Sequence, residues 1–381
     1  MPRPGRNGAV RGYHRIVAKL GTNVLTGGSD ALDRRVMASL VRQAATLMDE
    51  GREVVIVTSG AIVAGRQRLG QAAPGRRDAP YRQALASVGQ PQLMRAYDEL
   101  FAAHGYVAAQ TLLTKRDLQD RAGYLNARNA LLGLLEMRVA PVINENDAVA
   151  IDELEDARIG DNDNLSALVA NLIDADVLVL LTDTGGLHTA DPRRSRSAEL
   201  IPRVERITKE IEALAGGSES GRGIGGMITK LQAAKLATGG GSDVYIAGGH
   251  ERDALRRIAE GEHVGTLFPA RASRMESRKR WMLSGLSTRG SIVIDAGAAR
   301  ALTEQRKSLL PAGVREVQGT FRRGDAVNIC LPTGAVIACG ITNYDDRELT
   351  AIRGVRSDRI AAVLGHAYGA EAVHRNNLVI L

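Results

Sequence analysis

Several segments combine glycine with lysine, aspartate or asparagine directly after apolar runs that are typical of β-strands. The first is Lys19-Leu20-Gly21-Thr22-Asn23, where a lysine at a strand end precedes a glycine. Glycine lets backbone N–H groups approach an anion closely. The segment therefore indicates an anion contact, although a Lys-Leu-Gly run is also common where a strand simply ends.

The second segment, Thr58-Ser59-Gly60-Ala61, leads into a helix and superficially resembles the nucleophile elbow of hydrolases. That motif requires a glycine two residues before the serine, and Val57 occupies this place. We therefore interpret Ser59 as a hydrogen-bond donor to a ligand. A helix N-cap is the structural alternative for the same side chain.

Two clusters of carboxylates and amides follow further along the chain. Asn144-Glu145-Asn146-Asp147 comes after an apolar run, and Gly160-Asp161-Asn162-Asp163-Asn164-Leu165-Ser166 precedes an apolar helix. Helix capping would use one such side chain, not the whole set. The clusters indicate binding of ligand ammonium groups, cationic side chains or Mg²⁺, with a solvated turn as the alternative.

A glycine-rich segment, residues 221–230, formally fits G-x-G-x-x-G at Gly221, Gly223 and Gly226. A dinucleotide site is excluded because a strand should lead into that fingerprint, whereas a Gly/Ser-rich loop precedes it here. A Walker A loop is excluded because Thr229, and not glycine, precedes Lys230. The remaining interpretation is a loop that opens a helix and cradles phosphate.

No arrangement of histidines has metal-site spacing, and no Ser-His-Asp or Cys-His set stands out, so the sequence predicts no protein-built metal site.

A folded domain must position these loops, and the pattern of residues 13–268 predicts such a domain. Short β-branched runs alternate there with helical periodicity, which is typical of a three-layer αβα domain with a mainly parallel sheet. Ligands bind such sheets beyond the carboxyl ends of the strands. The predicted strands are Ile16–Leu20, Val54–Thr58, Val107–Gln110, Val139–Ile143, Val177–Leu181 and Val244–Ala247.

The texture changes after Phe268, where a basic stretch precedes short strand-like runs with Gly or Pro turns. We expect a small, mostly β second domain at residues 289–381, joined by a basic linker at residues 269–288. Residues 1–12 are Pro/Gly/Arg-rich, which predicts a disordered tail. The second domain should contain strands at Ser291–Asp295, Ala326–Leu331 and Ala335–Ala338 and a helix near Ala298–Thr303.

Composition narrows the function. The net charge of +7 suits anionic partners such as nucleotides or RNA, but aromatic residues make up only 3%, which leaves few rings for stacking on nucleic acid. The two cysteines form no disulfide framework, and the sequence shows neither a membrane span nor a signal-peptide core. We therefore expect a cytoplasmic protein that does not contact membranes.

Taken together, the segments resemble the amino acid kinase family. Residues 13–268 carry the resemblance in one consistent order, including Val17–Thr22, Val57–Ala61, Leu181-Thr182-Asp183 and Gly225–Lys230. Within that family, Ile143–Asp147 followed by Gly160–Ser166 is similar to the members that phosphorylate the side-chain carboxylate of free L-glutamate. The last part, with Gly319–Val327 and Ala338–Thr342, resembles a PUA domain.

The resemblance implies residue roles and partners. Lys19 and Lys230 would be catalytic cations held by Asp163, and Ser59, Asp147 and Asn162 would bind glutamate. ATP with Mg²⁺ would be used, in the first step of proline biosynthesis, with proline as a feedback inhibitor of a homo-oligomer. The implied ATP-binding residues are Lys19, Thr182, Asp183, Ile224, Gly225, Gly226, Met227, Ile228, Thr229 and Lys230.

Alternatives remain open at this point. Another amino acid kinase, acting on acetylglutamate, aspartate or a nucleoside monophosphate, would share the lysine and glycine loops. The discriminating features are the Asn144–Asp147 cluster and the PUA-like tail. An RNA-binding protein that acts through this tail would leave the loops of the first domain unexplained. Because aromatic residues are scarce, we interpret the tail as structural or regulatory.

Overall fold

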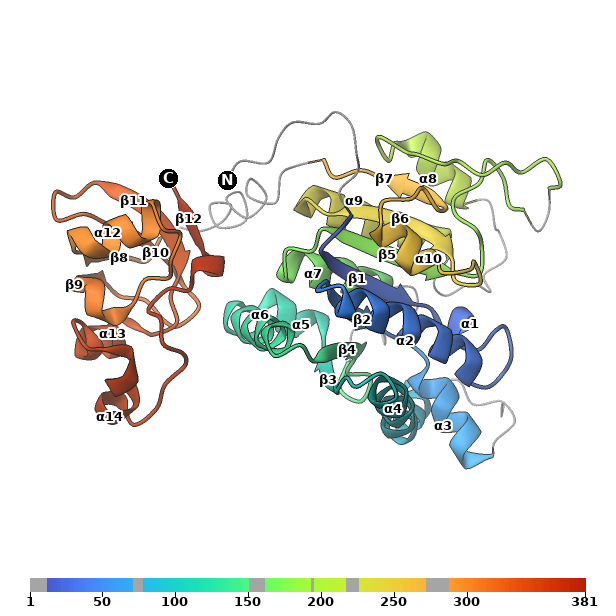
Figure 1. Ribbon diagram of the computed structural model, residues 1–381, viewed down its shortest axis with the longest axis horizontal. Coiled ribbons are helices and arrows are strands. Elements are labelled where there is room, and N and C mark those ends of the chain that lie inside the picture. The colour runs from blue at the N-terminus through green and yellow to red at the C-terminus, as the bar shows by residue number, and fades with distance from the viewer. Residues whose placement is uncertain (1–11, 71–77, 151–161, 193–194, 217–225, 272–287) are drawn as a thin grey trace. The chain divides into compact units, whose positions relative to one another are not determined.

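A computed structural model describes residues 12–70, 78–150, 162–192, 195–216, 226–271 and 288–381 (Figure 1). The chain divides into two compact units, residues 1–119 with 126–273 and residues 120–125 with 274–381. No helix in the described ranges is both long and apolar enough to cross a membrane. The expected tail and most of the expected linker lie outside the described residues, so those boundaries stay predictions.

The first unit is built on a seven-stranded sheet with the order β3-β4-β2-β1-β5-β6-β7. The first six strands pair in parallel and β7 is antiparallel to β6. This confirms the mainly parallel sheet that the sequence predicts, except that the prediction lacks the three-residue β7. The strands are β1 (Arg15–Leu20), β2 (Glu53–Val57), β3 (Ala108–Leu113), β4 (Ala140–Glu145), β5 (Val177–Thr182), β6 (Asp243–Gly248) and β7 (Thr266–Phe268).

Helices connect these strands, and α2 shows why they form. The Asp33 carboxylate caps its N-terminus by accepting from the Arg35 backbone N–H at 2.8 Å, and Gly51, with a φ of 78°, follows its end. Apolar side chains at helical spacing fill its buried face. The helices before residue 260 are α1 (Thr22–Leu25), α2 (Arg34–Asp49), α3 (Ala61–Leu69), α4 (Ala79–Ala102), α5 (Lys115–Gln119), α6 (Arg121–Glu136), α7 (Asn162–Leu172), α8 (Lys209–Gly216), α9 (Met227–Gly240) and α10 (Ala254–Ala259).

Alternation along β1 assigns its side chains to two faces of the sheet. Ile16, Ala18 and Leu20 join the core formed with α2, α4 and α10, whereas Val17 and Lys19 point to the opposite face. That opposite face is covered by α7 and α9, which pack against each other and against the central strands (Figure 1). The alternation of side chains along β1 thus directs Lys19 toward α7 and α9.

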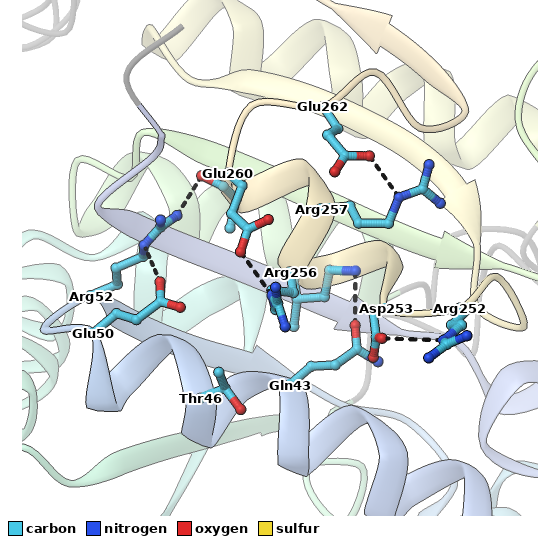
Figure 2. A network of polar contacts seen from close by, with 12 residues as sticks. Gln43, Thr46, Glu50, Arg52, Arg252, Asp253, Arg256, Arg257, Glu260 and Glu262 are labelled. Atoms are coloured by element: carbon cyan, nitrogen blue, oxygen red, sulfur yellow. Dashed lines mark hydrogen bonds and ion pairs between the residues drawn. The ribbon is translucent and has the colours of Figure 1, made fainter.

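A polar joint fixes α2 to α10 on the other face (Figure 2). The buried Gln43 side-chain oxygen accepts from the Leu255 backbone N–H at 3.1 Å, and Arg42 pairs with Asp253 at 2.9 Å. Around this joint, surface pairs such as Arg256 with Glu260 balance positive and negative charge. Because Gln43 is buried and the charged side chains are not, we assign most of the joint's stability to that hydrogen bond.

The second unit is the smaller one and is built on a five-stranded sheet with the order β12-β11-β10-β8-β9. Its own core includes Phe321 and Tyr344, and the Asp345–Glu348 capping box begins one of its helices. The small, mostly β character is as predicted, although the sequence does not predict β9, β12, α13 or α14. Its elements are β8 (Gly290–Ile294), α12 (Ala296–Thr303), η1 (Pro311–Gly313), β9 (Val314–Gly319), β10 (Ala326–Cys330), β11 (Val336–Ile341), α13 (Asp346–Ile352), η2 (Ser357–Arg359), α14 (Ile360–Leu364), η3 (Arg375–Asn377) and β12 (Leu378–Ile380).

Candidate active site

A cavity of about 300 Å³ lies at the carboxyl ends of the central strands of the first unit. Its lining includes Gly21 after β1, Ser59 after β2, Asp147 after β4 and Asp183 after β5. The parallel strands thus bring four distant segments of the chain to one edge of the sheet, where ligands of such folds bind.

Two lysines that are far apart in the sequence of the first unit meet at one buried carboxylate. The Lys19 Nζ atom lies 2.5 Å from Asp163 Oδ1, and the Lys230 Nζ atom lies 3.2 Å from Asp163 Oδ2. The Thr229 hydroxyl also donates to Asp163 Oδ2, at 2.9 Å. The Asp163 side chain has no exposed surface, whereas both lysines line the cavity. The arrangement presents to the cavity two ammonium groups that share one buried carboxylate.

Local structure explains this convergence. Lys19 is on the sheet face that α7 and α9 cover, Asp163 is in the first turn of α7, and Lys230 is in the first turn of α9. Since α7 and α9 pack side by side, their first turns can reach the same point. Local periodicity does not predict this contact, because the three residues are far apart in the chain; only the family resemblance implies it.

The Asn162 amide joins three of the predicted segments. Its Nδ2 atom lies 2.8 Å from the Thr58 backbone oxygen, 3.0 Å from Ser59 Oγ and 3.1 Å from Asn144 Oδ1. The Asn144 amide nitrogen in turn donates to Gln90 Oε1 of α4 at 2.8 Å. These contacts tie the loops after β2 and β4 to the start of α7.

The side-chain oxygen of Asn162, Oδ1, remains available as a hydrogen-bond acceptor. It is buried and has no hydrogen-bond partner among the described residues. The amide cannot be reversed, because the Thr58 backbone oxygen that it contacts can only accept. A buried acceptor at a cavity wall is suited to a ligand donor such as an ammonium group.

A buried phenol supports the Ser59 loop from behind. The Tyr97 hydroxyl of α4 lies 2.7 Å from Thr58 Oγ1, and both residues are buried. Burial raises the pKa of Tyr97 well above its ordinary value, so the phenol stays neutral and able to donate. Ser59 itself is not the helix cap, since Gly60 occupies the N-cap of α3 without a side-chain hydrogen bond.

The predicted nucleotide residues divide into two groups. Thr182 and Asp183 line the cavity, and the Thr182 hydroxyl donates to the Asp183 carboxylate at 3.1 Å. The Asn23 amide also contacts Asp183, at 3.3 Å. The second group is at the start of α9, where Gly226 is the N-cap. Met227, Ile228 and Thr229 follow it without lining the cavity, and Ile224 and Gly225 lie outside the described residues.

Three residues of α4 near the cavity are not predicted from the sequence, namely Arg82, Gln90 and Tyr97. Arg82 lines the cavity, and the other two contact the loops that do. They belong to a long helix in which Gly, Asp and Asn are not clustered as they are in the loops. Only the packing of this helix against the sheet reveals them.

Comparison with known proteins identifies the family of the chain. Residues 14–248 match the model of the amino acid kinase family, and residues 290–364 match that of the PUA domain. The chain is 52% identical to a glutamate 5-kinase of Dehalococcoides mccartyi strain CBDB1, over 97% of this chain and 99% of that protein.

Two further relatives are similar to the chain over nearly its whole length. A glutamate 5-kinase of Herpetosiphon aurantiacus is 52% identical over 96% of this chain and 98% of that protein. A glutamate 5-kinase of Deinococcus radiodurans is 50% identical over 96% of this chain and 100% of that protein. The chain belongs to the amino acid kinase family.

Proposed function

We propose that this chain transfers the γ-phosphoryl group of ATP to the side-chain carboxylate of free L-glutamate, forming glutamyl 5-phosphate for proline biosynthesis. The observation that carries the proposal is the cavity in which Lys19 and Lys230 share Asp163 beside Ser59, Asp147 and Asn162. Membership of the amino acid kinase family and near full-length similarity to proteins named glutamate 5-kinase support it.

The chemistry requires positioning and cations more than a base. A glutamate carboxylate has a pKa of about 4.3 and is ionised at neutral pH, so its oxygen can attack phosphorus directly. The new carboxylate O–P bond forms as the bond from the γ-phosphorus to the bridging oxygen breaks, and ADP leaves. Lys19 and Lys230 offset the negative charge that shifts onto the transferring group and the leaving oxygen.

Asp163 acts as a positioning residue in this proposal. Its two carboxylate oxygens contact the two lysines separately, so it sets the spacing of their ammonium groups. A site whose cations are fixed before the substrates arrive need not reorganise during the reaction. The buried surroundings also strengthen each charge interaction relative to bulk water.

The glutamate end of the cavity contains complementary groups. Asp147 lines the cavity and is only partly exposed, so its carboxylate suits the substrate ammonium. The Asn162 carbonyl oxygen provides a second acceptor, and the Ser59 hydroxyl lies beside the Asn162 amide. These groups leave the side-chain carboxylate of glutamate free to extend toward the lysines.

ATP would occupy the side of the cavity near Thr182, Asp183 and the start of α9. Lys230, which lines the cavity, would contact its phosphates, and the family resemblance gives the segment before it the same role, since a helix N-terminus after a glycine-rich segment suits an anion. Mg²⁺ bound together with ATP would neutralise part of the charge of those phosphates. Among the described residues, no group of three or more Asp, Glu, His or Cys side chains gathers that could hold a metal.

The remaining features extend the same proposal. We assign the enzyme to the cytoplasm as a homo-oligomer that proline inhibits. The PUA domain is a structural or regulatory part of it, and RNA is the less favoured partner. A filter-binding assay with structured RNA tests that last point.

A coupled assay of ADP release tests the activity. L-Glutamate, N-acetylglutamate, aspartate and UMP are compared as phosphoryl acceptors, and only L-glutamate should support rapid turnover. Hydroxylamine in the assay should convert the acyl phosphate to a hydroxamate in proportion to ADP. Equal or faster turnover with another acceptor, or ADP release without hydroxamate, would overturn the proposal.

A further inference from the structure

Arg82, in the first turn of α4, is a third cation at the cavity. Among the described residues that line the cavity, the positively charged side chains are Lys19, Lys230 and Arg82. Arg82 is partly buried. The two lysines share Asp163, whereas Arg82 comes from a different element and a different wall.

Two hydrogen bonds place α4 against the segment that carries Asp147. The Gln83 amide, next to Arg82, donates to the Ala150 backbone oxygen at 3.3 Å. Further along the helix, Gln90 accepts from the Asn144 amide at 2.8 Å. The first turn of α4 therefore lies beside residues 144–150, and this part of the cavity wall contains both a cation, Arg82, and an anion, Asp147.

Glycines fix α4 relative to the Ser59 loop. A Cβ atom at Gly89 of α4 would lie 1.8 Å from the Ala61 backbone oxygen, and one at Gly65 of α3 would lie 2.0 Å from the Leu85 backbone oxygen. The two helices thus touch backbone to backbone, which only glycine permits. Because α3 follows Ser59 directly, the backbone of Arg82 has a defined place relative to Ser59.

The charges of glutamate leave one group to be matched. The substrate has two carboxylates and one ammonium group, and the proposed function assigns the side-chain carboxylate to the lysines and the ammonium to Asp147. The α-carboxylate still needs a cation once it leaves water. A guanidinium can hold a carboxylate through two parallel hydrogen bonds, which an ammonium cannot.

We propose that Arg82 binds the α-carboxylate of glutamate and so selects a free α-amino acid as the phosphoryl acceptor. Arg82 and Asp147 then form a pair that recognises the α-carboxylate and the ammonium together. This inference rests on the proposed function, and it adds a specificity residue to it.

Substrate truncation combined with substitution tests the contact. The acceptors are L-glutamate and its α-amide, which keeps the reacting carboxylate and the ammonium but replaces the α-carboxylate with a neutral group. The variants are Arg82→Gln and Arg82→Lys. Arg95→Gln is the matched control, since Arg95 is on the same helix with a side chain that is 75% exposed and paired with Glu99. kcat/KM is measured for both acceptors, or an inhibition constant where the α-amide turns over too slowly.

The expected outcome is a loss specific to one acceptor. Arg82→Gln should lower kcat/KM for glutamate by about 100-fold, as for a partly desolvated charge pair that loses one partner. The value for the α-amide and the KM for ATP should change by less than about threefold, since neither involves the lost contact. Arg82→Lys should have an intermediate kcat/KM for glutamate, because lysine keeps the positive charge but cannot form the two parallel hydrogen bonds of a guanidinium.

Other outcomes separate this inference from the proposed function. If Arg82→Gln lowers kcat/KM equally for glutamate and its α-amide, or mainly raises the KM for ATP, Arg82 does not bind the α-carboxylate. If Arg82→Gln fails to fold, equal losses for both acceptors in Arg82→Lys overturn the inference in the same way. If the unsubstituted protein does not phosphorylate glutamate at all, the proposed function itself fails.

Discussion

The Lys19 ammonium lies 2.5 Å from one oxygen of the Asp163 carboxylate, whose side chain is completely buried. The other oxygen faces Lys230 at 3.2 Å. Two cations from opposite ends of the first unit therefore depend on one anion. Substitutions of these residues should separate the catalytic effect of the cations from the structural effect of the anion.

Removing either lysine should mainly slow the chemical step. We expect Lys19→Ala and Lys230→Ala to lower kcat by about 100-fold or more, in the range for removing an electrostatic stabiliser. Arginine should substitute poorly, because its wide planar fork does not reproduce a compact ammonium. Steady-state kinetics of ADP release measure the effect.

Lys235→Ala is the control for Lys230→Ala. Lys235 is on the same helix, but its side chain is 57% exposed and pairs with Glu212. This variant should retain normal kcat. Near-normal kcat in Lys19→Ala or Lys230→Ala would mean that the residue is not a catalytic cation.

Removing the shared anion should affect folding as well as rate. Asp163→Asn leaves two lysines, 4% and 7% exposed, without their common counter-charge. We expect a loss of about 3 to 5 kcal/mol in the free energy of unfolding, as when one partner of a buried ion pair is removed. Chemical denaturation measures this loss.

A second substitution checks the cause. Asp163→Asn combined with Lys230→Met removes one of the unpaired cations, so part of the lost stability should return while activity stays low. A double variant no more stable than Asp163→Asn would show that charge imbalance is not the source of the destabilisation.

The sequence predicts the scaffold well and the contacts across it poorly. Strand periodicity locates β1 to β6, and the position of Lys19 at a strand end follows from it. The pairing of Lys19 with Asp163 could only be inferred from family resemblance, because local periodicity carries no information about distant partners. The short β7 and β12, with three residues each, lack enough length for a periodic signal.

The same limit explains which cavity residues the sequence does not reveal. Loops rich in Gly, Asp and Asn stand out because few structural roles need so many of these residues together. Arg82, Gln90 and Tyr97 instead occupy ordinary helical positions, where arginine, glutamine and tyrosine are common. Their meaning depends on the packing of α4, which is set by Gly65 and Gly89 and by contacts across the sheet.

Substitutions at the glutamate end of the cavity should weaken the binding of glutamate more than the binding of ATP. We expect Asp147→Ala to raise the KM for glutamate about 30- to 1000-fold, equivalent to about 2 to 4 kcal/mol, because the bound ammonium loses its counter-charge. Ser59→Ala and Asn162→Ala should have smaller effects, since they remove neutral partners. The KM for ATP should stay nearly unchanged in all three.

Asp98→Ala is the control for Asp147→Ala, because Asp98 is exposed on α4 and does not line the cavity. It should leave both KM values unchanged. If Asp147→Ala has no effect, or weakens ATP and glutamate equally, the glutamate end of the cavity has been misplaced.

The first unit should act without the second. Each unit has its own sheet and its own core. We expect a chain that ends near Lys279 to fold and to phosphorylate glutamate, with altered regulation as one consequence. Thermal unfolding and ADP release measure both properties, and soluble, folded protein without activity would show that the second unit completes the enzyme.

The contact between α3 and α4 should tolerate no added atom. A Cβ at Gly89 would lie 1.8 Å from the Ala61 backbone oxygen, and backbone cannot give way as a flexible side chain does. We expect Gly89→Ala to lower the free energy of unfolding by about 1 to 3 kcal/mol, as overpacking does, despite the higher helix propensity of alanine. It should also raise the KM for glutamate, because α4 and the Ser59 loop must separate.

Gly133→Ala isolates the helix propensity in the same protein. Gly133 is inside α6, and an added Cβ there meets nothing within 4 Å. This variant should therefore be about 0.5 to 1 kcal/mol more stable, with an unchanged KM. Chemical denaturation and glutamate kinetics are compared for both variants. If Gly89→Ala gains stability as Gly133→Ala does, the two helices are not in backbone contact, and the defined place of Arg82 relative to Ser59 loses its basis.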